Sequence, residues 1–197
     1  MIQAGFDYNR TVVAYHGRRR ETARRLVSGE PFARSENDDD WLGHGVYFWE
    51  HAPRQAWWWA ERRYGSAQAS VIGAIIRLGS CLDLLDPANT QIVKAGFDEL
   101  VQEAKVGQTR LPRNANNYKY LDCVVFNRVY SMLEASGFKV ETARGIFVPM
   151  LGGKMPRLWK RSGVLAGAHV QLCVREQQNI VAAWSVRRDG RYGEDAT

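Results

Sequence analysis

The chain has 197 residues, 45% of them hydrophobic and 24% charged, with a formal net charge of +6. This length provides for one domain with a sizeable core and argues against two, so we expect a single domain over 1–186 and a flexible C-terminal tail over 187–197. The cysteines, Cys81, Cys123 and Cys173, lie in apolar runs without the spacing of a zinc site or a disulfide framework. We therefore expect a soluble, cytoplasmic protein without a metal.

The first half of the chain is predicted to contain four strands and two helices. Runs of β-branched and aromatic residues favour strands, and Pro53 suits the first position of a helix, where no amide hydrogen is needed. The polar segment 34–40 is predicted to be a loop. In chain order we expect a strand, a basic helix, a strand, a tryptophan-rich helix and two strands, at Thr11–Tyr15, Glu21–Ser28, Val46–Phe48, from Pro53, Val71–Leu78 and Cys81–Leu84.

The second half is predicted to contain two amphipathic helices and then three strands. Apolar residues recur every three or four positions from Val93 to Ala104 and from Leu121 to Leu133, and Gly137 suits the C-terminal cap of the second helix. Because strands and helices do not alternate regularly, the sequence predicts an α+β fold rather than a doubly wound one. The three expected strands are Gly145–Val148, His169–Arg175 and Ile180–Val186.

Two glycine-containing motifs accompany aromatic residues. The first, Tyr15–Gly17, places a histidine at the end of a predicted strand, beside a glycine that lets a ligand approach the backbone. The second, Gly43–Phe48, leads into a helix with Trp57, Trp58 and Trp59, which cannot all face the core because successive helix residues are about 100° apart. Together the motifs suit a slot for a planar ring, although ordinary core packing also accounts for each motif alone.

Together these segments resemble the ADP-ribosyltransferase superfamily, in particular its diphtheria-toxin-like branch that includes the poly(ADP-ribose) polymerases. The resemblance runs from Tyr15–Gly17 through Gly43–Phe48 to the late strand His169–Arg175. It implies split mixed and antiparallel β-sheets that form an NAD-binding cleft with flanking helices. Three segments that agree in order are more specific than any one of them.

The resemblance also implies roles for individual residues around NAD, which would be the co-substrate. His16 would bind ribose hydroxyls, Gly17 would pair with the carboxamide, and Tyr47 would stack on the nicotinamide ring. The following helix would supply a second aromatic wall of the slot, at Trp58 or Trp59. Gln55 of the same helix would be a polar partner of the carboxamide. Of the two tryptophans, Trp58 is the preferred wall.

The third position of the family signature departs from the pattern. Where the family has a catalytic glutamate, the late strand has Gln171. A glutamine oxygen can still accept a hydrogen bond from the ribose 2′-hydroxyl, but it brings no negative charge to the oxocarbenium-like transition state. The change is consistent with slower transfer, a single transfer, help from another carboxylate, or no catalysis. The carboxylates considered for that help are Glu50, Asp122 and Glu176.

The loop before the late strand commonly helps to select the acceptor in this family, and here it is basic. Residues 152–163 contain four cations, one tryptophan and no acidic residue. Cations beside a base-stacking ring suit a single-stranded nucleic acid, although a solvated loop can have the same composition. His169 and Arg175 share a strand face with Gln171 and are added to the acceptor site. The loop residues expected to bind the acceptor are Lys154, Arg157, Trp159, Lys160 and Arg161.

The sequence therefore favours an NAD-dependent mono-ADP-ribosyltransferase that modifies nucleic acid, RNA in preference, as a toxin or an anti-phage effector restrained by an antitoxin. Two alternatives stay open: a transferase directed at proteins, and a catalytically inactive module that binds NAD, ADP-ribose or nucleic acid. Removal of a 2′-phosphate from RNA with NAD is less favoured, because the chain has no room for the winged-helix domain that accompanies this activity.

Overall fold

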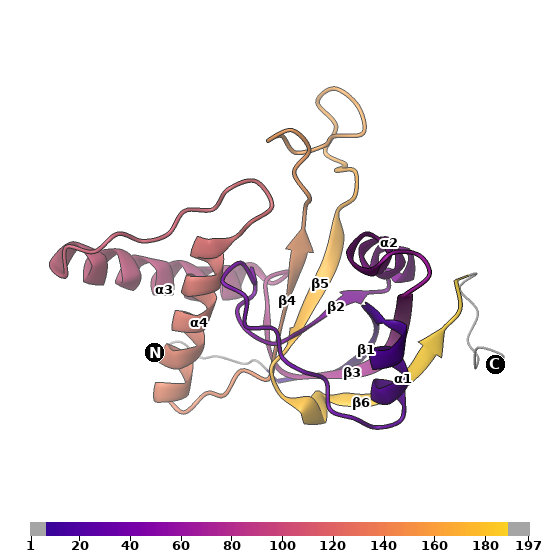
Figure 1. The fold of residues 1–197 in the computed structure, drawn as a ribbon. Helices are drawn as coiled ribbons and strands as arrows, with labels where there is room; N and C mark the ends of the chain where they lie inside the picture. Colours follow the sequence, from indigo (N-terminus) through magenta and orange to yellow (C-terminus); the bar gives the residue numbers. More distant parts are fainter. Residues whose placement is uncertain (1–6, 189–197) are drawn as a thin grey trace.

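The computed structural model describes residues 7–188, which form four α-helices and one mixed six-stranded sheet (Figure 1). The predicted α+β class is confirmed, whereas residues 189–197 of the expected tail lie outside the described residues. The elements in chain order are β1 (Asp7–Arg19), α1 (Arg20–Val27), β2 (Val46–Glu50), α2 (Pro53–Tyr64), β3 (Ala69–Asp83), α3 (Pro87–Val106), α4 (Tyr120–Ala135), β4 (Thr142–Phe147), β5 (His169–Val174), the 3₁₀ helix η1 (Gln177–Asn179) and β6 (Ile180–Val186).

The sheet has two well-paired halves, β1–β3–β6 and β2–β5–β4, joined by short contacts. β1 pairs with β2 only at Ala14–Tyr15, and β3 pairs in parallel with β4 only at Cys81–Asp83. Since β1 also pairs with β3 along most of its length, the strand order closes into a ring with β6 attached to β3. Two split sheets were expected, but the described residues form one hydrogen-bonded sheet, because β1 and β3 are long enough to reach both halves.

β3 is a single strand where two were predicted. Gly79, between the two predicted strands, has a φ of 57° that suits glycine, and it still pairs with Tyr8 of β1. The sequence pattern indicated an interruption at the glycine, whereas the backbone passes through it and continues to Asp83. The result is a strand that serves both halves of the sheet.

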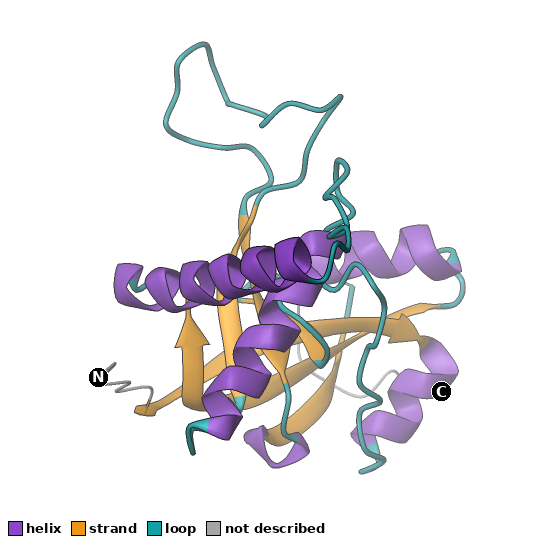
Figure 2. Ribbon diagram, turned by 90° about the vertical axis from the view of Figure 1, so that its left-hand side faces the viewer, coloured by secondary structure: helices purple, strands orange, loops and turns teal. Residues whose placement is uncertain are grey.

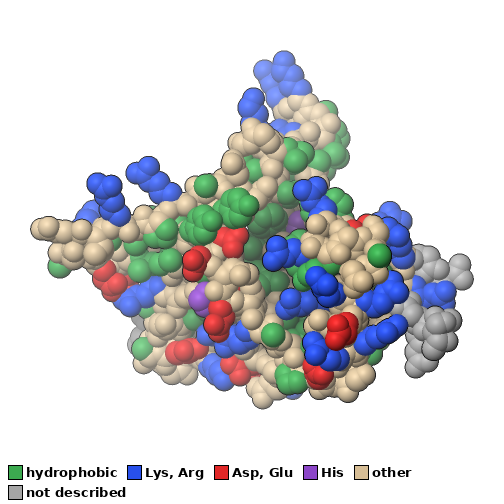
Figure 3. All heavy atoms as spheres, in the orientation of Figure 1, with side chains coloured by type: hydrophobic (Ala, Val, Ile, Leu, Met, Phe, Trp, Pro, Cys, Tyr) green, Lys and Arg blue, Asp and Glu red, His purple; other side chains and the backbone are tan. Residues whose placement is uncertain are grey.

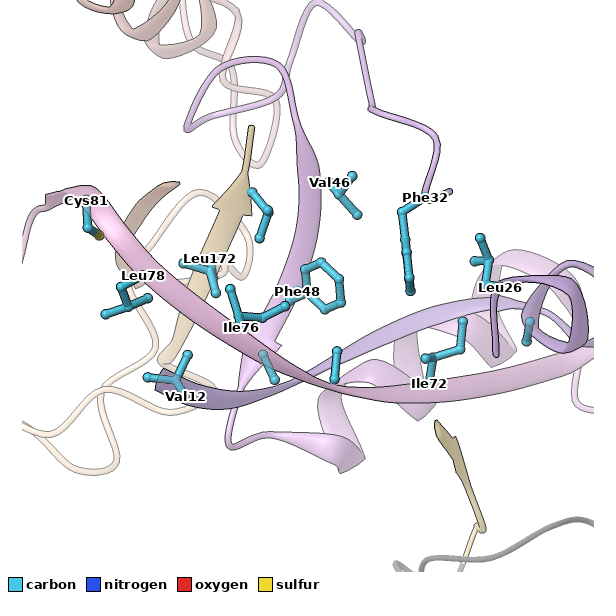
Figure 4. Close-up of a cluster of buried hydrophobic side chains, with 14 residues drawn as sticks. Val12, Leu26, Phe32, Val46, Phe48, Ile72, Ile76, Leu78, Cys81 and Leu172 are labelled. Carbon is cyan, nitrogen blue, oxygen red and sulfur yellow. The ribbon is translucent and has the colours of Figure 1, made fainter. Parts of the chain in front are cut away.

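The main core fills the interior of the strand ring. Alternate residues of each strand point inward, so that the inward residues of β1, β2, β3 and β5 meet (Figure 4). Val12, Phe48, Ile76 and Leu172 represent these four strands, and Leu26 adds the buried side of α1. Because this cluster draws on both halves of the sheet, the halves share one core.

The remaining helices cover the outer faces of the sheet. α3 and α4 pack together over β2, β4 and β5, and α2 packs over β1 and β3. Pro53 begins α2 as predicted, and Gly137, at φ 84°, follows the end of α4. None of the helices within 7–188 combines the length and the apolar character needed to cross a membrane.

Two loops extend from the body on the same side (Figures 1 and 2). The longer one, residues 148–168, joins β4 to β5 as a protruding hairpin, and the other, residues 107–119, joins α3 to α4. The hairpin contains the basic segment that the sequence assigns to the acceptor.

Candidate functional site

The three strands that carry the sequence motifs are neighbours in the sheet. Ala14 of β1 lies opposite Glu50 of β2, and Trp49 of β2 lies opposite Gln171 of β5. β2 therefore lies between the strand with the histidine motif and the strand with Gln171. Segments from both ends of the sequence meet in this part of the sheet.

His16 is buried within β1 rather than placed at its end, because β1 continues to Arg19. Its Nδ1 lies 2.6 Å from the carbonyl of Tyr47 and must carry the hydrogen, while Nε2 accepts from Nε of Arg18 at 2.9 Å. Burial, reinforced by the charge of Arg18, lowers the pKa of His16 from 6.5 to about 4. His16 is thus a neutral imidazole with both nitrogens bonded, and a ribose hydroxyl would have to displace Arg18.

Gly17 faces α2. A Cβ at this position would lie 2.8 Å from the carbonyl oxygen of Ala56 and 3.1 Å from both the Trp59 ring and the Cβ of Ala60. The glycine therefore lets the helix approach the strand directly, and its outer face is covered by α2.

Tyr47 is fixed beneath the loop that precedes its strand. Its hydroxyl donates to the carbonyl of Gly43 at 2.8 Å and accepts from the amide of Leu42 at 2.9 Å, and its ring packs in the cluster under α4. Burial raises the Tyr47 pKa well above 10. A Cβ on Gly43 would meet the Tyr130 ring at 2.7 Å, and one on Gly45 would meet the sulfur of Cys173 at 2.5 Å. Close packing thus accounts for both glycines of this motif.

The three tryptophans of α2 separate as the helix geometry requires. Trp57 and Trp59 pack against the sheet, with Trp59 5.6 Å from Trp49, whereas Trp58 is 53% exposed and has the Arg62 guanidinium 4.9 Å from its ring centre. Tyr47 belongs to the cluster under α4. The structure therefore does not bring Tyr47 and Trp58 together as two walls of one slot.

Gln171 belongs to a chain of hydrogen bonds that the sequence analysis missed. Its Oε1 accepts from the Trp41 indole at 2.6 Å, and its Nε2 donates to Nε2 of His169 at 3.1 Å. His169 then donates from Nδ1 to the carbonyl of Gly167 at 2.7 Å, and burial lowers the pKa of this histidine. Phe147 lies between the rings of Trp41 and His169. The position thus uses both an acceptor and a donor, which a glutamine has and a carboxylate lacks.

An open depression of the surface, with a volume of about 410 Å³ and here called the cavity, lies between the start of α2 and the start of β5. Gln55 and His169 are the predicted site residues that line it, and His16, Gly17, Tyr47, Trp58 and Trp59 do not. Ala52 caps α2 without a side-chain hydrogen bond, so the partial positive charge of the helix end and the guanidinium of Arg54 both favour an anion here. The lining residues are His51, Ala52, Pro53, Arg54, Gln55, Gly167, Ala168 and His169.

The three carboxylates considered as helpers of Gln171 are bonded elsewhere. Glu50 points to the opposite face of the sheet, where Arg144 donates to it at 2.8 and 2.9 Å. Glu176 pairs with Lys139 at 2.9 Å, and Asp122 accepts from Asn114 at 2.7 Å. The Gln171 chain therefore includes no carboxylate.

Arg175 is separated from the other predicted acceptor residues. It donates to Glu134 and to the carbonyl of Val140, and its guanidinium lies 4.0 Å from the centre of the Tyr130 ring. Along an extended strand, six residues from His169 correspond to about 20 Å. The structure thus commits Arg175 to packing against α4.

The loop residues of the predicted acceptor site do lie together on the hairpin. Lys154, Trp159, Lys160 and Arg161 are exposed, and the guanidinium of Arg157 donates to the carbonyl of Ser162 and so holds the tip of the hairpin. His169 stands at the base of the same hairpin and lines the cavity.

Comparison with known proteins adds no assignment. No family model matches the chain, and neither a curated protein nor a solved structure matches it. Among residues 7–188, no group of three or more histidine, cysteine or acidic side chains is placed to hold a metal ion. The features that bear on function are therefore the cavity, the Gln171 chain of hydrogen bonds and the hairpin.

Proposed function

We propose that the protein is an NAD-dependent mono-ADP-ribosyltransferase that modifies nucleic acid, RNA in preference. The observation that carries this proposal is the adjacency of β1, β2 and β5, with a cavity at the head of β5 that Gln55 and His169 line. An enzyme of this kind would act in the cytoplasm as a toxin or anti-phage effector, and an antitoxin would restrain it.

The cavity has groups suited to parts of NAD. The start of α2 and Arg54 favour the negative pyrophosphate, and the Gln55 amide can pair with a carboxamide. In the transfer, the bond from ribose C1′ to the nicotinamide nitrogen breaks, and nicotinamide leaves with the electron pair. A nucleophile of the acceptor then bonds to C1′ and loses its proton. Oε1 of Gln171 would accept a hydrogen bond from the ribose 2′-hydroxyl once the Trp41 indole, which now donates to this atom, moves away.

A non-catalytic binding module is the second candidate. The observation in its favour is that the three side chains that the resemblance implies for catalysis are already bonded: His16 at both ring nitrogens, Tyr47 at its hydroxyl and Gln171 at its amide oxygen. A module with this cavity would bind NAD or ADP-ribose without releasing nicotinamide.

The test is incubation of the purified protein with labelled NAD and total RNA, single-stranded DNA or cell protein. We expect nicotinamide release with label on nuclease-sensitive material, loss of both in Gln55→Ala and His169→Ala, and little change in Trp58→Ala, which lies outside the cavity. Gln171→Glu adds a negative charge and should speed nicotinamide release. Label on protein alone would favour the protein-directed transferase, and NAD binding without release would favour the module.

A further inference from the structure

The net positive charge of the protein lies in two loops and in the helix ends beside one of them. Residues 105–120 and 148–168, here called the two-loop surface, carry eight cations and no acidic residue, whereas the whole chain has a net charge of only +6. The rest of the chain is therefore net negative, so the loops differ in sign from the body. The eight cations are Lys105, Arg110, Arg113, Lys119, Lys154, Arg157, Lys160 and Arg161.

This charge is not neutralised within the protein. In the part of the chain that the structure describes, none of the eight cations forms an ion pair. Two of them donate to backbone carbonyls, Lys119 to Asn116 and Arg157 to Ser162. The space-filling view shows Lys and Arg side chains at the tip of the upper projection and on the upper edge of the left one, with apolar side chains between them (Figure 3). Such a surface is complementary to a polyanion.

The two loops are fixed to each other and to the body. The side chain of Asn117 accepts from the amide of Met150 at 2.7 Å and donates to its carbonyl at 3.3 Å, which joins the α3–α4 loop to the hairpin. Asn114 accepts from the amide of Leu121 at 2.9 Å and donates to Asp122 at 2.7 Å, which holds the same loop on the start of α4. The cations of both loops therefore belong to one surface.

Exposed apolar side chains gather on the same surface. It carries eight of the thirteen large hydrophobic side chains that are exposed in the described structure. The rings of Tyr118 and Tyr120 lie parallel at 6.0 Å, and Trp159, near the hairpin tip, is 62% exposed. Exposed apolar groups of a monomer are ordinarily scattered, so this clustering indicates a partner. The eight are Val106, Tyr118, Tyr120, Leu151, Met155, Leu158, Trp159 and Val164.

We infer that the two-loop surface binds single-stranded nucleic acid, with the α3–α4 loop as a second arm beside the hairpin. A duplex presents phosphates and hides its base faces, which would leave the exposed rings and aliphatic side chains without partners. A single strand offers phosphates to the cations and base faces to Tyr118, Tyr120 and Trp159. The hairpin returns through Gly167–His169, which lines the cavity, so a strand held by both arms leads to that cavity.

This inference supplies the acceptor surface of the proposed transferase and rests on that function, but the binding itself needs no NAD. The experiment measures fluorescence anisotropy of a labelled 20-nucleotide single-stranded RNA, without NAD, over a range of salt. Three variants test the surface: Lys154→Ala/Lys160→Ala/Arg161→Ala for the hairpin, Arg110→Ala/Arg113→Ala for the second arm, and Tyr118→Ala/Tyr120→Ala for stacking. Arg24→Ala/Arg63→Ala removes two exposed cations from α1 and α2 and is the matched control.

We expect each test variant to bind at least about tenfold more weakly, and the control to bind like the wild type. The slope of log affinity against log salt should fall by roughly 0.7 for each phosphate that is no longer bound, so by about 2 in the hairpin variant and about 1.4 in the second-arm variant. The tyrosine variant should lose affinity with little change of slope, because stacking involves no counterion. Circular dichroism and melting temperature confirm that each variant is folded.

Three results would overturn the inference. They are wild-type affinity in the second-arm variant, equal affinity for duplex and single-stranded RNA with no effect of the tyrosines, and binding of phosphatidylserine vesicles in place of RNA through the same residues. Failure of the proposed function gives a different result. If Gln55→Ala and His169→Ala bind RNA normally and no protein releases nicotinamide from NAD, the surface stands and the transferase does not.

Discussion

At the scale of single residues, His16 shows how burial fixes a protonation state. The unfolded chain binds a proton at this histidine below about pH 6.5, whereas the folded protein rejects it until about pH 4. The contribution of the neutral imidazole to stability is therefore complete above pH 6.5 and is lost as the pH falls. His169, whose pKa is also lowered, adds a loss of the same sign.

We expect the free energy of unfolding in urea to fall by roughly 3 kcal/mol between pH 6.5 and 4 on account of His16. His16→Gln removes the titration. It should be less stable than the wild type at pH 7, because the bonds to Tyr47 and Arg18 are altered, but should lose less stability on acidification. If the unfolding free energy of the wild type and of His16→Gln depended equally on pH, His16 would not have the lowered pKa described above.

Much of the site lies beyond what residue types can predict. Gln171 stood out in the sequence, yet its partner Trp41 did not, because the indole reaches it only through the opposition of Gly145 and Gln171 in the sheet. A Cβ on Gly145 would come within 2.9 Å of Trp41, so the glycine makes room for the ring. No pattern of neighbouring residues in the sequence predicts this register between β4 and β5.

At the scale of elements, the contact between α2 and β1 depends on one missing Cβ. In Gly17→Ala the new methyl group would meet the carbonyl of Ala56, which belongs to the helix backbone and cannot rotate away. We expect a loss of about 1–3 kcal/mol in unfolding free energy, as α2 moves outward. Gly163→Ala is the control, because a Cβ there meets nothing within 4 Å. Equal stabilities in chemical denaturation would contradict this packing.

The lengths of β1 and β3 were poorly predicted, whereas β5 and β6 were predicted to within one residue, and the difference has a physical reason. The apolar repeats of α3 and α4 predict the one face of each helix that is buried. Pro53 and Gly137 predict the start of α2 and the end of α4, because these ends depend on the local backbone. The lengths of β1 and β3 depend on each other, because residues 16–19 of β1 pair only with β3, and residues 69–70 of β3 pair only with β1. Residues such as Arg18 and Arg77 lie in strands for this reason and not through their own preference.

At the scale of the whole molecule, a buried charge network ties the sheet together. Arg144 of β4 donates to Glu50 of β2 and, at 2.9 Å, to Asp83 of β3, and all three side chains are at most 10% exposed. The network thus joins strands from both halves of the ring. Removal of the cation would leave two carboxylates buried. Among residues 7–188, the other cation paired with either of them is Arg10, at 3.7 Å from Asp83.

We expect Arg144→Met to lower the free energy of unfolding by about 3–5 kcal/mol, because uncompensated buried charge is costly. Adding Glu50→Gln and Asp83→Asn to this variant should restore part of the loss. Arg128→Met, which removes a more exposed cation that pairs with Glu99 and Glu103, should cost less than about 1 kcal/mol. If both arginine variants lose the same stability in urea titration, the network does not join the halves.

The cavity is a property of the whole molecule and was not predictable from the sequence. Its two walls, 51–55 and 167–169, are far apart in the chain and meet because β2, which leads into α2, pairs with β5. The resemblance nonetheless pointed to Gln55 on one wall, and the alternation of side chains along the late strand pointed to His169 on the other. The positive charge of the hairpin was also evident from the sequence. The hydrogen bonds that join the hairpin to the α3–α4 loop could not be predicted, because they depend on how the chain folds.

The paired hydrogen bonds between Asn117 and Met150 bear on avidity. Two weak contact areas held at a fixed spacing behave as a bivalent ligand, because once one is occupied the other meets the same molecule at an effective concentration in roughly the millimolar range. Loss of the Asn117 amide would remove no charge and no ring, yet it would uncouple the two areas. Short oligonucleotides that span one area would bind as before, and long ones would lose their advantage. The preference for long over short oligonucleotides would then depend on the neutral side chain of Asn117.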